Sequence, residues 1–383
     1  MKKMRFLLIL IAATSIIACK KKGCTDETAT NYSEEAKKDD GTCVYPELSI
    51  PSTYSFTDTS GNSTVSFDGQ TDRLNQLEEM AIYMKAGTDL TLNPDILTAM
   101  FENEGDNAND NFSFSSTKQL KNKCFEVDVA LYEGYLTSLA LASEDNSEVA
   151  SSGQAGVLTS GTSKYLFAAN GIEYAQVIEK GLMGAVFLNQ ALNVYFGADK
   201  MNVDNSSAVS VSEGKFYTEM EHHWDEAFGY FGAPIDYQTN TEDLKFWTKY
   251  YDIQAADLSP TLVIMNSFLK GRAIISQGFE TSERDEEIEN IRKEWERLSA
   301  AQAVTYLEGA VENFGTDNAK FLHELSEAYA FIICLKYVTL DTRVISISQI
   351  ENLRDVTIGN DFWAVTLSDL NSAIASLNSI YGF

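Results

Sequence analysis

The segment GLMGAVFLNQALNVYF, residues 181–196, decides the fold of this chain. It is apolar around much of a helical circumference, whereas a helix at a protein surface has one apolar stripe and one polar face. A helix of this kind needs neighbours on several sides, and the middle of a helical bundle provides them. We therefore predict a central helix from about Asn170 to Phe196 in an all-α protein.

The rest of the chain indicates the same fold class. Only 5 prolines occur in 383 residues, which favours long helices. Apolar residues at helical spacing and capping residues predict the further elements. Helices are expected from Thr71 or Asp72, after Asn93-Pro94, and over residues 117–143, 213–230, 260–277, 283–314, 318–338 and 367–379. This gives about eight helices, arranged as antiparallel hairpins in one or two bundles over residues 47–383.

Several segments lack helical spacing. Residues 48–69 alternate apolar and polar side chains around Ser60-Gly61-Asn62, which predicts a short β-hairpin or an extended lead-in. Residues 104–116 and 144–163 are predicted to be polar loops. The loop at 233–258 would separate two halves, about 47–235 and 236–383, if the body is divided. Its aromatic residues argue that it packs against the body; they are Tyr237, Phe246, Trp247, Tyr250 and Tyr251.

The first residues have the sequence pattern of a lipoprotein signal peptide. Three basic residues precede the apolar run FLLILIAATSII (6–17), and Ile16-Ile17-Ala18-Cys19 places a small residue before a cysteine. Such a run is too short to cross a bilayer, which needs about 20 residues. We predict that residues 1–18 are removed and that Cys19 is lipidated. The mature chain would then be held at a membrane of the cell envelope, facing the periplasm or the cell surface.

Four cysteines remain beside Cys19. Export implies an oxidising compartment, and a segment without a core needs a staple, so a Cys24–Cys43 disulfide is expected in the 19–46 tether. Cys124 and Cys334 lie in apolar helical patterns and are either a second disulfide or two buried thiols.

The tether also resembles a small Cys-bounded module, CTDxxAxNY…DDGxC, that occurs in many exported bacterial proteins. The matching residues are Asp26, Asn31, Tyr32, Asp39, Asp40 and Gly41. Its acidic residues are oxygen ligands of the kind that calcium prefers, so the 24–43 loop is either a calcium site or a stapled spacer.

The charge balance excludes one class of partner. The net charge is −27, and no basic stripe offsets repulsion from phosphates, so nucleic acid is not expected to bind.

All three histidines of the chain fall on predicted helices beside carboxylates. In the helix KFYTEMEHHWDEAFGYFG (215–232), the 100° spacing places Phe216, Met220, Trp224, Ala227 and Phe231 on the buried face. Glu219, His223 and Glu226 follow one flank of that face, His222 lies just beyond, and Asp225 is predicted to point to solvent. Imidazole and carboxylate donors of this kind suit zinc or iron.

A second helix could complete such a site. His323 has Glu327 one turn later in FLHELSEAYAF (321–331). The candidate metal ligands are thus Glu219, His223 and Glu226, with His222, His323 and Glu327 as helpers. The alternative is that these are ordinary surface pairs and an interhelical histidine.

The segment His223-Trp224-Asp225-Glu226 resembles the H-x-x-E motif of the imelysin family, also called insulin-cleaving membrane protease-like proteins. EYAQVIEKGLMGAV, LSEAYAF and NDFWAVT also resemble recurrent segments of an uncharacterised lipoprotein branch, and the resemblance covers about residues 50–383. It implies an exported or lipid-anchored helical bundle linked to iron or haem uptake. The chain departs from the fuller G-x-H-x-x-E motif at Glu221, where the family has glycine.

The expected function is binding rather than catalysis. The chain contains no H-E-x-x-H, G-x-S-x-G, Walker or C-x-x-C segment. We predict an iron-uptake type of lipoprotein that binds a divalent metal (iron or zinc), haem or a metal-bearing ligand. Two alternatives stay open. One is a non-catalytic surface lipoprotein for nutrient capture, with segment 237–251 contacting an outer-membrane transporter. The other is a metallopeptidase.

Overall fold

The computed structural model describes residues 20–27, 29–105, 108–237, 239–258 and 262–383. The predicted signal peptide and Cys19, the predicted lipidation site, lie outside the described residues. The chain divides into two compact units, one ending at Ser49 and the other spanning Ile50–Phe383. No helix in the described ranges is long and apolar enough to cross a membrane.

The first unit is a small stapled loop. Strand β1 (Lys22–Gly23) pairs in parallel with β2 (Lys38–Asp39), and a disulfide joins Cys24 to Cys43, as predicted. The Asn31 side chain bonds the Thr42 carbonyl at 2.6 Å and the Val44 amide at 2.8 Å. Asp39 and Asp40 accept backbone amides two residues later. The module residues therefore stabilise the loop itself, and calcium binding stays a prediction.

The second unit confirms the all-α fold class. Its α-helices are α1 (Asp68–Lys85), α2 (Pro94–Glu102), α3 (Val129–Ser143), α4 (Tyr174–Leu182), α5 (Ala198–Met201), α6 (Glu219–Phe231), α7 (Phe246–Leu258), α8 (Val263–Gln277), α9 (Thr281–Asn313), α10 (Asn318–Cys334), α11 (Ile347–Glu351) and α12 (Leu367–Tyr381). Three π-helical segments are η5 (Met183–Leu188), η6 (Gln190–Tyr195) and η9 (Asn352–Ile358). Short 3₁₀ turns are η1 (Ala86–Thr88), η3 (Lys121–Lys123), η4 (Glu126–Asp128), η7 (Val211–Glu213), η8 (Leu335–Tyr337) and η10 (Phe362–Ala364).

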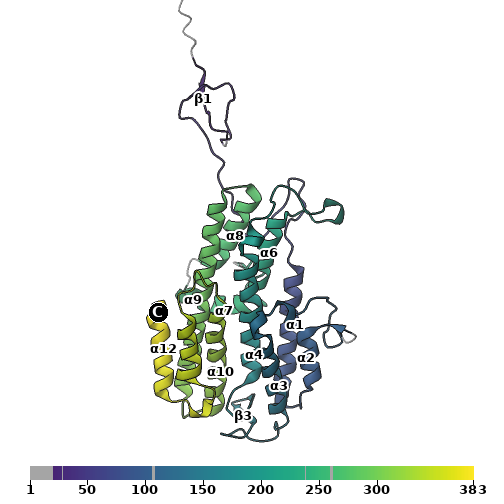
Figure 1. Cartoon of the computed structure of the whole chain (residues 1–383), viewed down its shortest axis with the longest axis vertical. Helices are drawn as coiled ribbons and strands as arrows, with labels where there is room; N and C mark the ends of the chain where they lie inside the picture. The colour runs from purple at the N-terminus through teal and green to yellow at the C-terminus, as the bar shows by residue number, and fades with distance from the viewer. Residues whose placement is uncertain (1–19, 28, 106–107, 238, 259–261) are drawn as a thin grey trace, which may run out of the picture. The chain divides into compact units, whose positions relative to one another are not determined.

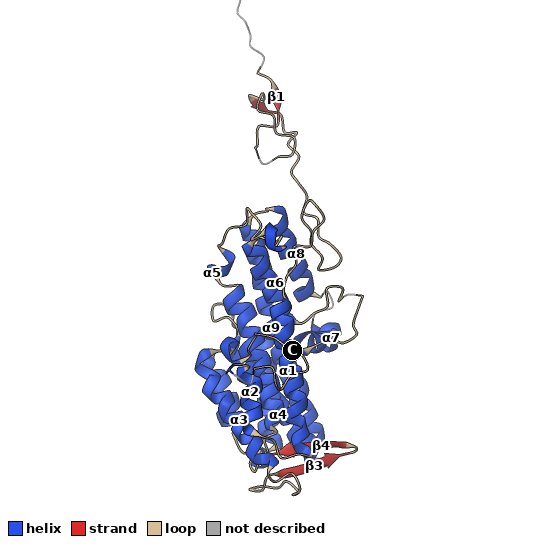
Figure 2. Ribbon diagram, turned by 90° about the vertical axis from the view of Figure 1, so that its right-hand side faces the viewer, coloured by secondary structure: helices blue, strands red, loops and turns tan. Residues whose placement is uncertain are grey.

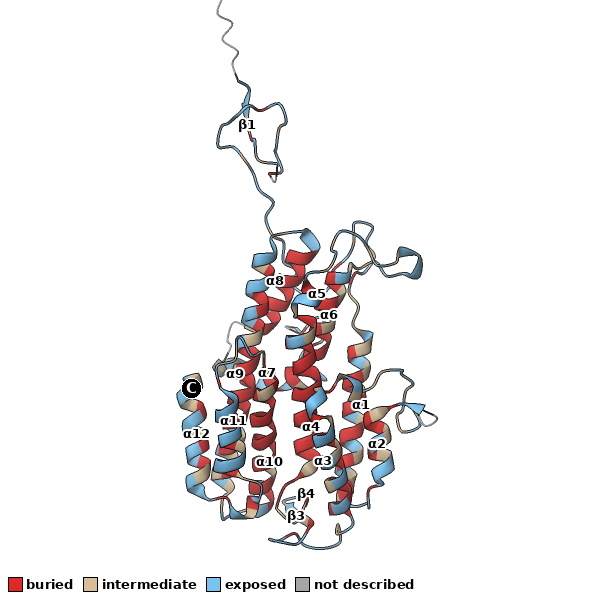
Figure 3. Ribbon diagram, viewed as in Figure 1, coloured by how far each residue is buried: buried red, intermediate tan, exposed pale blue. Residues whose placement is uncertain are grey.

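The long helices pack side by side along this unit (Figure 1). The longest helix, α9, contacts α7, α8, α10 and α12, and α4 contacts α1, α3 and α10. Figure 3 shows that α4 and α10 are buried over most of their length. All the side chains of η5 are inaccessible to solvent, which confirms the prediction of a central helix. The helix widens to π geometry in η5 and η6, a distortion that recurs at functional sites.

The structure differs from the prediction at residues 117–128 and 144–163. Residues 117–128 are 3₁₀ turns and extended chain rather than the start of α3, because Cys124 is extended and the Phe125 amide donates to the Ala185 carbonyl at 2.8 Å. Within the predicted loop 144–163, β3 (Gly156–Ser160) begins an antiparallel hairpin with β4 (Ser163–Phe167). Figure 2 shows this hairpin at one end of the helices. The expected lead-in is confirmed by a bridge between Thr57 and Ser63.

The segment 233–258 was predicted as a loop, but it contains α7. The prediction that its aromatic residues pack against the body is confirmed. Tyr237, Trp247, Tyr250 and Tyr251 are all buried, and the Trp247 indole donates to the Met183 carbonyl at 2.9 Å. These four rings of the proposed 237–251 contact surface are therefore not available to a partner, and Phe246 is half-buried.

The remaining cysteines are buried thiols. Cys124 and Cys334 are not joined to one another, and burial raises the pKa of Cys124 to about 12. Of the two alternatives for this pair, the structure shows the second.

Candidate functional site

Helix α6 carries the H-x-x-E segment and is covered on nearly all sides. A capping box fixes its first turn: Thr218 accepts the Glu221 amide, and the Glu221 side chain accepts the Thr218 amide. The helix packs against α1, α8 and η6. Met220, Trp224, Ala227 and Phe231 are buried, as the spacing predicted.

Two acidic residues of α6, Glu221 and Asp225, form ion pairs with a buried arginine. Arg272 of α8 is fully buried and donates to Glu221 at 2.6 Å and to Asp225 at 2.8 Å. The Tyr54 hydroxyl also donates to Asp225, at 2.8 Å. The prediction that Asp225 points to solvent is therefore wrong, because α8 and the lead-in cover that face. Glu221 stands where the imelysin motif has glycine, and here it pairs with the guanidinium.

His223 is buried and its tautomer follows from its two partners. Its Nδ1 atom lies 2.9 Å from the Lys200 carbonyl, and its Nε2 atom lies 3.3 Å from Lys200 Nζ. An ammonium group only donates, so Nε2 accepts and the proton sits on Nδ1. Burial lowers the pKa of His223, and the Lys200 charge adds to this effect. The ring is thus a neutral imidazole whose Nε2 lone pair faces the Lys200 ammonium.

Glu226 lies on the same flank and is tied to two neighbouring elements. The Gln70 amide of α1 donates to it at 3.0 Å, and the Tyr195 hydroxyl of η6 also bonds it. Burial and the Glu226 charge raise the pKa of Tyr195. The Tyr195 ring lies 6.3 Å from the His223 ring. The structure therefore brings His223 and Glu226 together around Tyr195.

Basic side chains surround this pair. Arg73 is buried and donates to two backbone carbonyls, at 2.9 and 3.0 Å. Lys123 lies 5.9 Å above the Tyr195 ring. Burial lowers the pKa of Lys123, and the charges of Arg73, Lys200 and Lys118 lower it further. The Glu226 charge has the opposite effect and raises this pKa. Among the described residues, none of these four cations has a carboxylate ion-pair partner.

Two other predicted ligands on α6 do not join the pair. His222 turns the other way, with Nδ1 3.0 Å from the Ser66 carbonyl and its ring stacked 4.5 Å from that of Tyr217. Glu219 is exposed at the first residue of the helix.

The histidine of α10 belongs to a separate network. His323 Nδ1 lies 2.7 Å from Glu173 and its Nε2 lies 3.3 Å from Glu327, which also pairs with Lys180 at 3.2 Å. Burial opposes a charge on His323, but the Glu173 hydrogen bond and the two carboxylates outweigh it and raise its pKa. The carboxylates lie on opposite ring nitrogens, so they do not converge on one point.

The two histidine groups share no residue, so the expectation that α10 closes the α6 site is not supported. In the part of the chain that the structure describes, no group of three or more His, Cys, Asp or Glu is arranged to hold a metal ion. Sequence reasoning also missed Arg73, Lys123, Lys200 and Tyr195. They come from four separate segments, and no local motif marks them.

The fold and the site define a helical-bundle protein with one neutral imidazole and one carboxylate among basic groups. Residues 51–383 match the family model described as "Domain of unknown function (DUF4856)", and the chain belongs to this family. No curated protein and no solved structure matches the chain significantly.

Proposed function

We propose that this chain is a lipid-anchored binding protein of the cell envelope that holds an anionic, metal-bearing ligand, such as haem or a ferric chelate, at His223 and Glu226. The observation that carries the proposal is the Nε2 atom of His223, an unprotonated acceptor 3.3 Å from Lys200 Nζ and close to further cations. A neutral imidazole nitrogen is the form that binds a metal.

The basic surroundings favour a chelate over a bare ion. Arg73, Lys118, Lys123 and Lys200 would repel a divalent cation, and no third protein donor stands beside the pair in the described residues. A haem or a ferric chelate brings most of its own donors and carries carboxylates. His223 would then supply one nitrogen donor to the group, and the cations would pair with its carboxylates. In a chain of net charge −27, such a cationic group is unusual.

Two further arguments come from the sequence. The basic, apolar and lipobox segments before Cys19 favour export and anchoring. The resemblance of the H-x-x-E segment to imelysin-like proteins favours a ligand of the iron-uptake type. A transporter in the outer membrane would be a fitting partner, but it would not contact the four buried rings of segment 237–251.

The test is a titration of the mature chain with haemin and with ferric citrate, followed by absorbance. We expect the His223→Ala, Glu226→Ala double variant to lose binding by about a hundredfold, because both the imidazole donor and the neighbouring carboxylate are gone. His222→Ala is the matched control on the same helix, and it should bind like the wild type. Equal binding by the double variant and the wild type would remove the proposed site, and no binding by the wild type would remove the proposal.

A further inference from the structure

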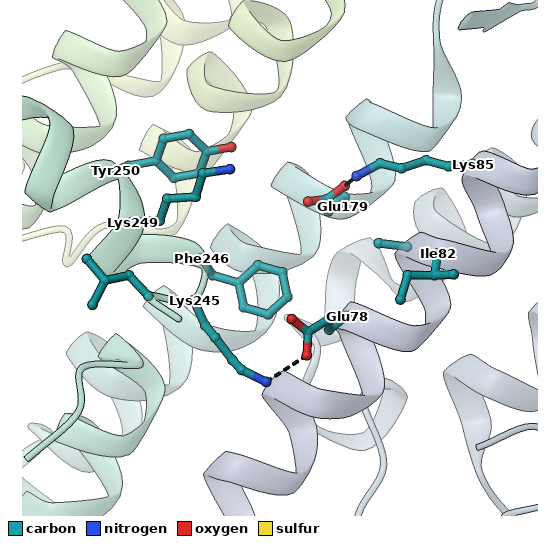
Figure 4. A pocket seen from close by; sticks show the side chains of 10 residues that line it. Glu78, Ile82, Lys85, Glu179, Lys245, Phe246, Lys249 and Tyr250 are labelled. Atoms are coloured by element: carbon teal, nitrogen blue, oxygen red, sulfur yellow. Dashed lines mark hydrogen bonds and ion pairs between the residues drawn. The ribbon is translucent and has the colours of Figure 1, made fainter. Parts of the chain in front are cut away.

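A cavity lies away from the α6 site, between α1, α4 and the start of α7. It measures about 280 Å³. Its lining is half charged and half apolar, and it shares no residue with the His223 group. Figure 4 shows the ring of Phe246 projecting between two ion pairs, Lys85 with Glu179 and Lys245 with Glu78.

Three lysines and two glutamates line the cavity, so the two acids can pair with only two of the lysines. Lys85 lies 2.6 Å from Glu179, and Lys245 lies 2.6 Å from Glu78. Both acids of the lining are therefore already paired. Lys249 has no carboxylate partner among the described residues, and its Nζ atom lies 6.0 Å above the Tyr250 ring. The cavity thus offers a single unpaired positive charge beside an aromatic face.

The backbone at Phe246 is held in a conformation that bulky residues avoid. Its φ angle is +46°, in the left-handed region. The next two residues fix it there, since the buried Trp247 and Thr248 bond the Met183 and Phe231 carbonyls at 2.9 and 2.8 Å. Backbone strain of this kind persists where the surrounding structure imposes it, and it gathers at ligand sites. Here it keeps an aromatic ring on the cavity wall.

The ring of Phe246 is half-buried. It meets Phe187 of η5 edge to face, with ring centres 5.4 Å apart. Its other side and the side chain of Ile82, which is 67% exposed, border the cavity. An apolar group of a ligand would pack against both Phe246 and Ile82.

We infer that this cavity binds a small amphipathic carboxylate, whose single anionic group pairs with Lys249 and whose apolar or aromatic part packs on Phe246 and Ile82. The volume is at the lower end of small-molecule sites, which begin at about 300 Å³. One unpaired lysine matches a monoanion, whereas a doubly charged phosphate would need a second free cation. This inference does not rest on the proposed function at α6.

Calorimetric titration of the mature chain with 3-phenylpropionate tests the inference. Two matched probes accompany it: 3-phenylpropanamide, which lacks the charge, and propionate, which lacks the ring. We expect each to bind at least about tenfold more weakly than 3-phenylpropionate, because each lacks one of the two contacts.

Variants locate the site. Lys249→Met should weaken 3-phenylpropionate binding about tenfold. Lys293→Met, which removes an exposed lysine of α9, is the control and should leave the affinity unchanged. Phe246→Gly removes the ring while glycine accepts the positive φ angle, so it should weaken binding, and the relief of backbone strain offsets part of the packing lost on Phe187. Wild-type affinity in Lys249→Met, equal binding of the amide, or no binding of 3-phenylpropionate to the wild type would overturn the inference.

Discussion

His223 on α6 and His323 on α10 have nearly the same sequence surroundings and opposite electrostatics. Each has a glutamate about one turn later, and each is largely buried. Burial lowers the pKa of His223, with Lys200 adding to the shift. Burial acts in the same direction on His323, but Glu173 and Glu327 reverse it and raise the pKa.

The difference comes from residues distant in the sequence. Lys200 reaches His223 from α5, and Glu173 reaches His323 from the residue before α4. The Nε2 lone pair of His223 faces only the Lys200 ammonium, which a ligand would displace, whereas each ring nitrogen of His323 faces a carboxylate. Under the proposed function, histidine would serve ligand binding in one region, whereas in the other it joins neighbouring elements of the fold.

The largest expected effect is on protein stability, through the ion pairs between Arg272 and α6, the helix that carries His223. Arg272→Met would leave Glu221 and Asp225 buried without their guanidinium, and we expect the free energy of unfolding to fall by about 3–5 kcal/mol. Urea unfolding followed by circular dichroism measures it. Arg297→Met, which breaks a half-exposed pair on α9, is the matched control and should cost less than about 1 kcal/mol. Equal losses in the two variants would contradict the assigned role of Arg272.

A smaller effect distinguishes the two histidines by pH. Burial and the Lys320 charge lower the pKa of His323, but Glu173 and Glu327 outweigh them and raise it above the ordinary 6.5, while Tyr165 stacks on the ring. Its contribution to stability is therefore fully present below pH 6.5 and is lost as the pH rises through the folded-state pKa. His323→Gln should abolish this dependence and cost about 1–3 kcal/mol at pH 6, because two buried carboxylates lose their partner.

For His223 the dependence of stability on pH has the opposite sign. Its folded-state pKa lies below 6.5, so its contribution to stability falls as the pH decreases from about 6.5 through the folded-state value. NMR titration of the imidazole signals of the wild type checks both directions. A midpoint for His323 below that of His223 would show that the two environments are assigned wrongly.

The sequence predicted the fold class and most of the helices because their apolar spacing is local information. The start of α6 was also readable, since Thr218 and Glu221 form a capping box that the prediction from residue 213 overlooked. Asp225 could not be placed in the same way. A helical wheel puts it opposite the apolar stripe, but α8 covers that side and brings Arg272 from 47 residues away.

The site was predictable only in its local part. His223 and Glu226 are three residues apart on one helix, so spacing alone brings them together. Arg73, Lys123 and Lys200 reach the site through tertiary packing, and nothing in their own segments indicates it. α7 was missed for a related reason: its apolar residues face several neighbours, and they show no single helical stripe.

The smallest expected effect tests the cause of the His223 shift directly. Lys200→Met removes the ammonium 3.3 Å from Nε2 but keeps the backbone carbonyl that accepts from Nδ1. Both the lost charge and the lost hydrogen bond make protonation easier, so the pKa of His223 should rise toward 6.5, with a change in stability within about 0.5 kcal/mol. Lys215→Met removes a lysine that pairs with the exposed Glu213, and it should leave the imidazole midpoint unchanged. An unchanged midpoint in Lys200→Met would mean that burial alone lowers the pKa of His223. Lys200 could then no longer be counted among the cations that act on this histidine.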